Sequence, residues 1–392
     1  MLDASAFRAP EAGAIVRTMH GYDAFVPAPL PPSIAYDPAL VLALSRADTA
    51  LSELSGLGRY LPNPHLLIAP YIRREAVLSS RIEGTRASLS DVLLDEVRQS
   101  AADSSDDIRE VRNYVTALEY GVRRLTDLPL SLRLVQELHA RLMQDVRGNT
   151  ATPGEFRRRQ NWIGRPGSSL VTADYVPPPP EEVMQALYLW EGFLHAPRSM
   201  PDLVLCALLH EQFEAIHPFW DGNGRLGRLL IPLFLIERGR LSQPLLYLSA
   251  YFERRRSAYY HLLQRVRTDG DWPGWIRFFL EGVAVTADAA RLQAAALMDL
   301  RARFDGNLRP YPKARTVLDA LFANPYITVN RAASVLQSSA PTARSAIEFL
   351  RQHGVLEEIT GRAYGRTYCA TPILHALEAS GDADQDGGPT VM

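Results

Sequence analysis

The sequence contains very few cysteines, and this scarcity excludes two kinds of structure. Cys206 and Cys369 are the only two among 392 residues, and they lie far apart. A disulfide scaffold and a cysteine-based zinc site both need several closely spaced cysteines, so neither fits this chain.

Excess charge is also missing, because 42 lysines and arginines stand against 44 aspartates and glutamates, a formal net charge of −2. A protein that coats nucleic acid as a polycation along its whole length is therefore excluded, whereas a local basic patch is not.

Long hydrophobic runs are absent as well. Apolar stretches such as 229–236 are far shorter than the roughly 20 residues that a membrane-spanning helix needs. The first residues lack the basic and apolar regions of a secretory signal, so we expect a cytoplasmic protein with no membrane partner. Hydrophobic residues make up 47% and charged residues 22% of the chain, which is typical of a folded protein. The length suggests two or three domains.

The spacing of the apolar residues predicts a mainly α-helical fold. In most of the first 305 residues they recur every three or four positions, as in helices with one buried face. The expected helices are 38 onward with a glycine-containing break at 55–59, then 70–86, 108–125, 131–146, 181–195, 201–216, 225–238, 256–267 and 275–305.

One segment of the first 300 residues predicts β-structure. Residues 156–176 contain two short candidate strands around a turn rich in Gly, Pro and Ser, and the prolines at 177–180 end them. The proline-rich residues 26–38 predict an extended arm over the surface. The small and acidic residues 96–107 predict a surface connector.

The C-terminal residues predict a separate small domain. Helices are expected at 314–323, 329–336 and 340–353, followed by a hairpin. Three short helices and a two-stranded wing form the winged helix-turn-helix pattern. From Lys313 to Leu374 there are seven basic and four acidic residues, a net charge of +3. The acidic, glycine-rich residues 377–392 are expected to be disordered.

Residues 217–228 carry the densest set of chemically active side chains. They join two apolar helices, so buried elements hold the turn on both sides. The small residues of Gly-Asn-Gly let backbone N–H groups converge at a helix N-terminus, where phosphate binds. Arg225 and Arg228 add positive charge on one helix face. Asp221 offers a hard oxygen ligand for Mg²⁺, and His217 can accept a proton at neutral pH. Together these groups suggest attack by a hydroxyl on a nucleoside triphosphate.

Other interpretations of this segment fit less well. Residues 222–227 match GxGxxG, but a helix precedes them instead of the strand that a dinucleotide fingerprint requires. The spacing of His210, Glu211 and His217 is not that of an HExxH zinc protease, and no GxxxxGK[ST] phosphate loop occurs. A plain helix–turn–helix with a glycine cap and solvent-exposed arginines is the remaining alternative. This alternative does not explain why one His, one Asp and two Arg side chains occur together at positions where they can face the same space.

Residues 217–228 resemble the signature of the Fic family, HxFx[DE]GNGRxxR, with every fixed position filled. Members of this family share a helical core, and most transfer AMP from ATP to a Ser, Thr or Tyr hydroxyl of a protein. In similar kinases of the Doc type, the second glycine of the motif is lysine. Gly224 at this position therefore favours AMP transfer over phosphate transfer.

The resemblance implies a role for each residue of the motif. His217 becomes the general base for the target hydroxyl, and Asp221 becomes the ligand of Mg²⁺. The residues implied to bind ATP are Gly222, Asn223 and Gly224 at the α- and β-phosphates, and Arg225 and Arg228 at the β/γ end.

The resemblance extends to segments on both sides of the motif. In Fic proteins a β-hairpin flap before the motif pairs with the target by strand addition, and residues 156–176 stand at its place. Trp162 or Ile163 would then clamp the target, and a simple lid is the alternative. The Pro-rich N-terminal arm and the winged helix also fit such proteins.

Two further positions bear on the adenine base. Tyr259 and Tyr260 are similar to a tyrosine pair that lies near the adenine in the family, and ordinary core aromatics are the alternative. Arg267 stands where some relatives have Asn at the base site. This departure from the family pattern leaves the preference for adenine open.

A second motif, Ser79–Gly84, resembles the inhibitory pattern [ST]xxxE[GN] of the family. Ser79 and Glu83 are four residues apart and share one helix face. The resemblance implies that this helix packs on the core and that Glu83 pairs with Arg228. Such a pair occupies the donors that the γ-phosphate of ATP needs. A solvated helix end is the alternative, because so short a pattern arises often by chance.

The sequence thus predicts a self-inhibited Fic protein adenylyltransferase that uses ATP and Mg²⁺. The expected domains are an N-terminal arm with the inhibitory helix (1–107), a Fic catalytic core with a small β-hairpin flap (108–305), a winged helix-turn-helix domain (310–376) and a disordered acidic tail (377–392). The expected partners are a protein hydroxyl, including one of the chain itself, DNA at the winged helix, and a second copy in a homodimer. Two alternatives stay open: a DNA-binding regulator whose Fic core senses nucleotide, and a Fic enzyme that removes AMP or uses another nucleotide.

Overall fold

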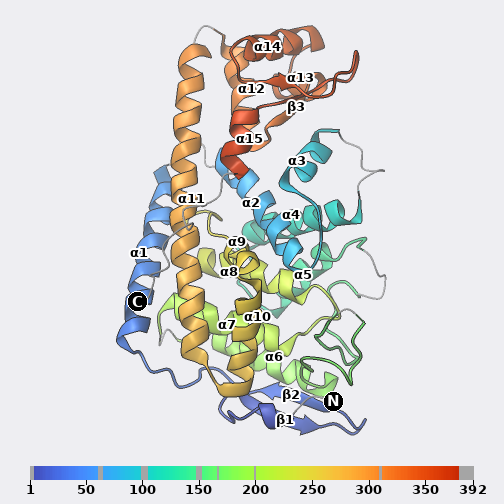
Figure 1. The fold of residues 1–392 in the computed structure, drawn as a ribbon, viewed down its shortest axis with the longest axis vertical. Helices are drawn as coiled ribbons and strands as arrows, with labels where there is room; N and C mark the ends of the chain where they lie inside the picture. The colour runs from blue at the N-terminus through green and yellow to red at the C-terminus, as the bar shows by residue number, and fades with distance from the viewer. Residues whose placement is uncertain are drawn as a thin grey trace, which may run out of the picture.

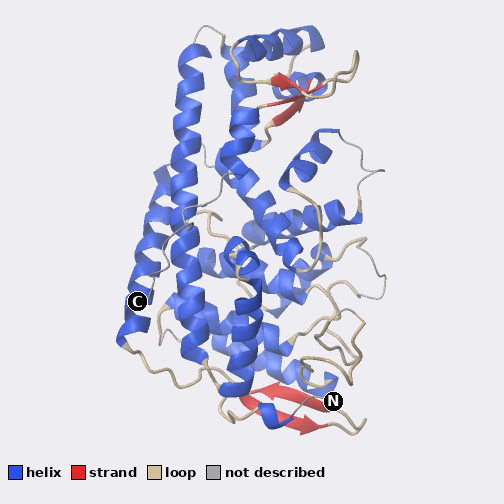
Figure 2. Cartoon of the chain, viewed as in Figure 1, coloured by secondary structure: helices blue, strands red, loops and turns tan. Residues whose placement is uncertain are grey.

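The chain folds mainly into helices, as the sequence predicts. The computed structural model describes residues 4–60, 65–98, 105–146, 152–165, 167–197, 200–308 and 311–378. Helices account for 63% of the described residues, and the strands described form two small antiparallel sheets. Figure 2 shows these strands as two groups, one near each end of the helical body. Within the described residues, no helix is both long enough and apolar enough to cross a membrane.

The elements follow one another in a fixed order from the N-terminus (Figure 1). After a short 3-10 turn (Ala4–Ala6), the helices are α1 (Pro38–Tyr60), α2 (His65–Ile82), α3 (Leu89–Arg98), α4 (Asp106–Arg124), α5 (Leu132–Leu142), α6 (Pro180–Leu194), α7 (Asp202–Ile216), α8 (Asn223–Glu237), α9 (Ser249–Arg254), α10 (Arg256–Asp269), α11 (Trp272–Leu308), α12 (Pro312–Ala323), α13 (Val329–Val335), α14 (Ala340–Gln352) and α15 (Thr371–Glu378). The strands are β1 (Gly13–Arg17), β2 (Asp23–Pro27), β3 (Tyr326–Thr328), β4 (Glu357–Glu358) and β5 (Thr367–Cys369).

Two predicted boundaries among the first helices are wrong. Helix α1 continues through the expected break at 55–59 to Tyr60. A Cβ at Gly58 would lie 3.0 Å from the Leu245 and Ser242 side chains, so this glycine allows close packing inside the helix instead of ending it. Helix α3 occupies the start of the expected connector 96–107. Residues 99–104 of that connector lie outside the described residues.

The N-terminal region contains a β-hairpin that the sequence analysis missed. Strands β1 and β2 pair antiparallel from Gly13–Pro27 to Arg17–Asp23. The backbone N–H of Phe25 in β2 donates to the carbonyl of Val176 at 2.9 Å, so the hairpin lies against the end of segment 156–176. Each strand has only five residues, which is too short for alternation of polar and apolar residues to stand out. The expected extended arm is therefore confined to the irregular residues 28–37.

Segment 156–176 does not form the two predicted strands. In its described residues the backbone pairs at one isolated antiparallel bridge, between Ile163 and Tyr175. Local turns take the place of a ladder, because Ser169 and Thr172 bond to each other's backbone groups and Trp162 Nε1 donates to the Ser168 carbonyl at 3.1 Å. Such side-chain bonds compete with strand pairing.

The helices α7 and α8 lie at the centre of the fold and hold the motif between them. Every residue of α7 from Leu203 to Ile216 is buried, so this helix is covered on all sides. Helix α8 is buried along most of its length and packs against α7, α4 and α5. Figure 1 shows the long helix α11 beside α1 on one flank of the molecule.

Helix α2 links the central helices to the C-terminal part of the chain. It packs against α4, α8 and α9 and also against α12. Its last turn carries Ser79 and leads into Glu83, beside the N-terminal end of α8. Because α2 is covered on several sides, we expect it to hold Glu83 in a defined position.

The C-terminal elements occur in the order that the sequence predicts, with two additional elements, β3 and α15. Strand β3 precedes α13, the three strands pair in the order β3-β5-β4, and α15 follows β5. Asn324 Nδ2 donates to the Leu93 carbonyl at 2.9 Å and Ser90 Oγ to Glu378 at 2.8 Å, which ties this part to α3. Its assignment as a winged helix-turn-helix domain stays a prediction. The expected disordered tail from residue 379 onward lies outside the described residues.

Candidate active site

The loop between α7 and α8 has an unusual backbone at both of its ends. His217 follows α7 with φ 50° and ψ 59°. This is the left-handed region of backbone conformation, which residues other than glycine rarely adopt. Gly222 precedes α8 with φ 78°, and a Cβ there would lie 2.7 Å from Met143 Sδ. Strain of this kind persists only where surrounding contacts hold it, and it clusters at functional sites.

Asn223 closes this loop with its side chain. Its Oδ1 accepts from the Phe219 N–H at 2.8 Å, and its Nδ2 donates to the Phe219 carbonyl at 2.9 Å. The side chain is buried. Only the backbone of Asn223 is therefore left for a ligand, which narrows the predicted role of this residue to its N–H group.

Two residues of segment 156–176 hold the other side of the loop, and the sequence analysis missed both. Arg157 Nε donates to the His217 carbonyl at 2.9 Å, and Asn161 Nδ2 donates to the Phe219 carbonyl at 2.8 Å. Both side chains are buried. Burial lowers the pKa of Arg157 to about 10, so it stays charged at neutral pH. The run of basic residues at 157–159 is visible in the sequence, but it does not indicate which arginine is buried or what it contacts.

His139 on α5 is a third support that the sequence analysis missed. Its Nδ1 accepts from the Gly154 N–H at 2.8 Å, so the proton of a neutral ring lies on Nε2. Nε2 then donates to the Asp221 carbonyl at 3.0 Å, and the ring stacks on Phe219 with centroids 3.7 Å apart. Burial lowers the pKa of His139 from 6.5 to about 4.

This depressed pKa predicts how acid affects stability. The folded state keeps His139 neutral down to about pH 4, whereas the unfolded chain protonates it below 6.5, so protons favour unfolding between these values. Relative to His139→Gln, the wild type should lose up to about 1.4 kcal/mol of unfolding free energy per pH unit in this window. Urea unfolding at several pH values measures the difference, with the exposed His261→Gln as control. Parallel curves for wild type and His139→Gln would contradict the assignment.

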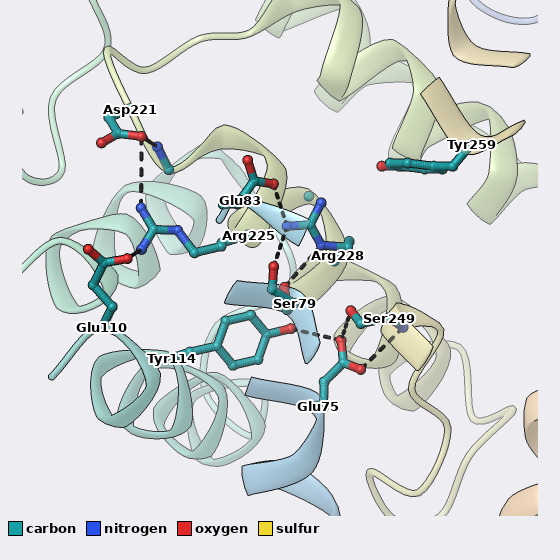
Figure 3. A network of polar contacts seen from close by, with 12 residues as sticks. Glu75, Ser79, Glu83, Glu110, Tyr114, Asp221, Arg225, Arg228, Ser249 and Tyr259 are labelled. Carbon is teal, nitrogen blue, oxygen red and sulfur yellow. Dashed lines mark hydrogen bonds and ion pairs between the residues drawn. The ribbon is translucent and has the colours of Figure 1, made fainter. Parts of the chain in front are cut away.

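Arg225 is buried and paired beside the N-terminal end of α8. Its Nη1 lies 2.7 Å from Glu110 Oε2 on α4, and its Nη2 lies 3.8 Å from Asp221 Oδ1 (Figure 3). Glu110 was not predicted from the sequence. Asp221 itself is exposed, with 56% of its side chain accessible, and its Oδ1 also accepts from the Gly222 N–H.

Arg228 makes the contacts that the inhibitory motif predicts. Its Nη2 lies 2.6 Å from Glu83 Oε1 and donates to the Ser79 carbonyl at 3.0 Å, and its Nε donates to Ser79 Oγ at 3.0 Å (Figure 3). The Arg228 side chain is 1% exposed and that of Glu83 is 35% exposed. The donors of Arg228 are thus turned toward α2 and Glu83.

Glu83 stays ionised because of this pairing. Burial raises the pKa of its carboxyl group, but the nearby charge and hydrogen bond of Arg228 outweigh burial, and the net pKa lies below the usual 4.5. A Cβ at position 224 would collide with Glu83 Oε1. Gly224 therefore provides the space that the carboxylate occupies against α8.

A buried network anchors the same face of α2 one turn before Ser79. Glu75 accepts from Ser249 Oγ at 2.5 Å and from the Tyr114 hydroxyl at 3.2 Å (Figure 3). Burial raises the pKa of Glu75. Glu75, Ser79 and Glu83 recur every four residues, so one face of the helix carries both the anchor and the inhibitory pair.

His217 is neutral in this environment. Burial lowers its pKa from 6.5 to about 3, and the positive charges of Arg157 and Arg267 act in the same direction. Its Nδ1 is buried, and an interaction of the ring with the Glu214 backbone opposes this lowering of the pKa without outweighing it. A neutral imidazole can accept a proton, and a bound polyphosphate would offset the two guanidinium charges.

Further buried charges lie next to this histidine. Arg267 Nε donates to Glu211 Oε1 at 3.1 Å, and its guanidinium lies 4.1 Å from the centre of the Tyr175 ring. Burial raises the pKa of Glu214 to about 7. Arg267, which departs from the family pattern, is thus engaged in an ion pair inside the protein.

The two tyrosines predicted near the base differ in their surroundings. Tyr259 is 1% exposed, and its hydroxyl lies 2.9 Å from His210 Nε2, so it belongs to the aromatic core. Tyr260 is 39% exposed and remains accessible. Trp162 in the flap segment is 38% exposed, and Ile163 forms the bridge to Tyr175.

The described residues contain no group of three or more His, Cys, Asp and Glu side chains that could hold a metal ion by themselves. Asp221 is a single exposed carboxylate in front of α8. One carboxylate with phosphate and water oxygens is the set that Mg²⁺ commonly uses when it binds together with a nucleotide. The residues present therefore fit a metal that arrives with phosphates and not a resident one.

Comparison with known protein families identifies two regions of this chain. Residues 41–123 match the model described as Fic/DOC family N-terminal, and residues 129–235 match the model described as Fic/DOC family. The first region contains α2 with Ser79 and Glu83, and the second contains the whole loop from α7 to α8.

Curated relatives agree with these matches. The chain is 30% identical over 188 residues to the protein adenylyltransferase Fic of Drosophila grimshawi, covering 47% of this chain and 35% of the relative. It is 27% identical over 227 residues to the protein of the same name from Drosophila mojavensis, covering 56% of this chain and 42% of the relative. The chain thus spans less than half the length of these two relatives.

Solved structures share the fold. A Fic family protein from Desulfovibrio desulfuricans superposes with a TM-score of 0.57 at 21% identity, over 87% of this chain and 98% of that one. Fic-1 from C. elegans superposes with a TM-score of 0.50 at 19% identity, over 64% of this chain and 73% of that one. At these identities the likeness is one of fold.

Proposed function

We propose, because residues 41–123 and 129–235 match the two Fic/DOC family models, that this chain is a Fic protein that transfers AMP from ATP to a hydroxyl of a protein, with Glu83 holding the site inhibited. The observation that supports the proposal most directly is the set of side chains around the Glu83 carboxylate. The charges of Arg228 and Arg225 both lower the pKa of Glu83, and the charge of Glu83 in turn acts on the pKa of the neutral His217, so the three side chains lie around this carboxylate. A space lined by these groups is suited to a polyphosphate.

The N-terminal end of α8 would bind the phosphates. The N–H groups of Asn223 and Gly224 lie in the first turn of a helix, where unpaired donors and the helix dipole attract anions, whereas the N–H group of Gly222 donates to Asp221 Oδ1 in this structure. Arg225 would contribute its charge from within the protein, held by Glu110. Arg228 would meet the γ-phosphate once Glu83 has moved away.

Mg²⁺ would bind at Asp221 together with the phosphates, and it would neutralise charge on the phosphate oxygens during transfer. The chain's own contribution there is the orientation of this aspartate. Its carbonyl accepts from His139 and its Oδ1 accepts from the Gly222 N–H at 2.6 Å. The second carboxylate oxygen is left to face the ligand.

His217 would act as the general base. The target oxygen attacks the α-phosphorus, the bond from that phosphorus to the bridging oxygen breaks, and pyrophosphate leaves with the bond's electrons. The hydroxyl proton passes to the neutral imidazole of His217. The negative charge that develops is met by the N–H groups of α8 and by Arg225.

Inhibition would follow from competition for one guanidinium. Glu83 and the γ-phosphate both need the Nη2 side of Arg228, which Glu83 occupies at 2.6 Å. Gly224 leaves room for this carboxylate, and the Glu75 network fixes the helix that carries it. ATP would then bind with its γ-phosphate displaced and its α-phosphorus out of line with the attacking oxygen.

The target would bind along segment 156–176. Its exposed Trp162 and the short pairing at Ile163 leave backbone groups available to an extended peptide. A hydroxyl of the chain itself or of another protein would thereby approach His217.

The role of Asp221 provides a direct test. In a Glu83→Gly background, Asp221→Ala should raise the Mg²⁺ concentration needed for half-maximal AMP incorporation by about tenfold, the effect of losing roughly 1.4 kcal/mol of binding. Incorporation from α-labelled ATP at increasing Mg²⁺ measures this shift. Asp127→Ala, at an exposed carboxylate beyond the end of α4, is the control. An unchanged Mg²⁺ requirement in Asp221→Ala would show that this carboxylate does not bind the metal.

A further inference from the structure

Exposed arginines gather around a groove of the C-terminal part, away from the site described above. The groove is lined by the end of α3, by α13 and α14, and by the loop between β4 and β5. The arginines on its walls are Arg98, Arg331, Arg344, Arg362 and Arg366, all of them exposed. One acidic residue, Glu348, lines the groove with them.

The positive charges of these arginines are available to an anionic ligand. Within the described residues, no ion pair joins any of the five to a carboxylate. Arg366 donates to the backbone carbonyl of Arg362 at 2.7 Å, and its charge is one of the groups that lower the pKa of the nearby Glu358. The acidic Glu348 lies 2.8 Å from Arg351, a residue outside the groove wall. The groove therefore carries net positive charge although the whole chain is slightly acidic.

Helix α14 and the loop between β4 and β5 line the groove with exposed side chains. Helix α14 buries Ala343, Ala346, Ile347 and Leu350 and exposes the opposite face with Arg344. Its 13 residues span roughly 20 Å. The loop between β4 and β5 carries Arg362, Arg366 and Tyr364, whose side chain is 90% exposed, and Figure 1 shows this loop projecting beside α13.

We propose that this surface binds duplex DNA, with α14 in the major groove and the β4–β5 loop along the phosphate backbone. A helix presented by a short turn from a preceding helix fits a groove about 12 Å wide. Arginines on two separate elements then reach phosphates on either side of it. The deep, narrow major groove of duplex RNA would not admit α14. This inference goes beyond the proposed transfer of AMP and does not depend on it.

Salt dependence of binding by the full chain tests the proposal. Fluorescence anisotropy with a labelled random-sequence DNA duplex should show binding at low salt that weakens steeply as salt rises, because phosphate contacts release counterions. The double variant Arg344→Ala/Arg362→Ala removes two contacts, so the slope of log K against log salt should become shallower by about 1.8.

The control removes the same charge elsewhere. Arg46→Ala/Arg123→Ala changes two exposed arginines on α1 and α4, and it should bind like the wild type. Thermal unfolding of both double variants confirms that they are folded. Three results would overturn the proposal: no binding at low salt, equal slopes for the two double variants, or duplex RNA or poly-glutamate bound as tightly as DNA. If the chain did not transfer AMP, the measured DNA affinities and their salt dependence would be unaffected.

Discussion

Glu83→Gly should raise incorporation of AMP from ATP into protein roughly tenfold or more, because a hydrogen bond to a charged group contributes about 1.5–3 kcal/mol and about 1.4 kcal/mol corresponds to tenfold. The carboxylate lies 2.6 Å from Arg228, whose side chain is almost fully buried. Its removal frees the guanidinium for the γ-phosphate, which brings the α-phosphorus into line. We take the lower end of the range because the Glu83 side chain is about a third exposed, at 35%.

A second substitution separates charge from bulk. Glu83→Gln keeps the size of the side chain and removes its charge, so it should be activated less than Glu83→Gly and more than the wild type. Protein-bound label from α-labelled ATP measures all three proteins. Ser79→Ala removes one acceptor of Arg228 and leaves the Ser79 carbonyl in place, and it serves as the matched control on the same helix face. Equal labelling of wild type and Glu83→Gly would contradict inhibition by this residue.

His217→Ala in the Glu83→Gly background should lower AMP incorporation by about 10²–10⁴-fold, the usual contribution of a general base. The effect should fall on the rate of transfer and not on nucleotide binding. His217 holds no phosphate in the proposed arrangement, whereas the N–H groups of α8 and Arg228 do. Single-turnover labelling measures the rate, and titration with a fluorescent ATP analogue measures binding.

Loss of the loop conformation is the competing explanation for such a result. His217 has positive φ, so replacement by Ala adds strain at that position. His217→Asn is the control, because Asn tolerates this backbone region better and cannot act as a base. If His217→Asn retained the transfer rate of its parent, a basic role for the imidazole would be excluded. If both variants lost nucleotide binding, the loop and not the base would be responsible.

Much of this site could be predicted from the sequence because its parts are local. Residues 217–228 are contiguous, and two strongly apolar helices border them, so the motif and its position between helices follow from periodicity alone. The pair Ser79 and Glu83 also lies within one helical turn. Its contact with Arg228 spans 145 residues and rested on a family resemblance, and the 2.6 Å separation agrees with that expectation.

The supports of the loop could not be predicted, because each depends on contacts between distant segments. Arg157 and Asn161 reach the loop across about 60 residues, and His139 reaches Asp221 across 82. A single arginine, asparagine or histidine carries no periodic signal that would set it apart. Glu110, which pairs with Arg225, was hidden for the same reason among the charged residues of α4.

The β-structure was the least predictable part of the fold. The hairpin of β1 and β2 was missed, and the strands expected at 156–176 reduce to one bridge. Strands of five residues or fewer are decided by what they lie against, and not by their own composition. In segment 156–176, the Thr172 side chain bonds to the backbone of Ser169, and local turns replace the ladder of the two predicted strands.

Parallel incubations with α-labelled and γ-labelled ATP test the central claim most directly. Three proteins are compared in the presence of Mg²⁺: the wild type, Glu83→Gly, and Glu83→Gly/His217→Ala. We predict that α-label becomes protein-bound strongly in Glu83→Gly and weakly in the other two, and that γ-label stays free in all three. Protein-bound γ-label, or the same α-labelling in Glu83→Gly with and without His217, would contradict a nucleotide-transfer site built around this loop.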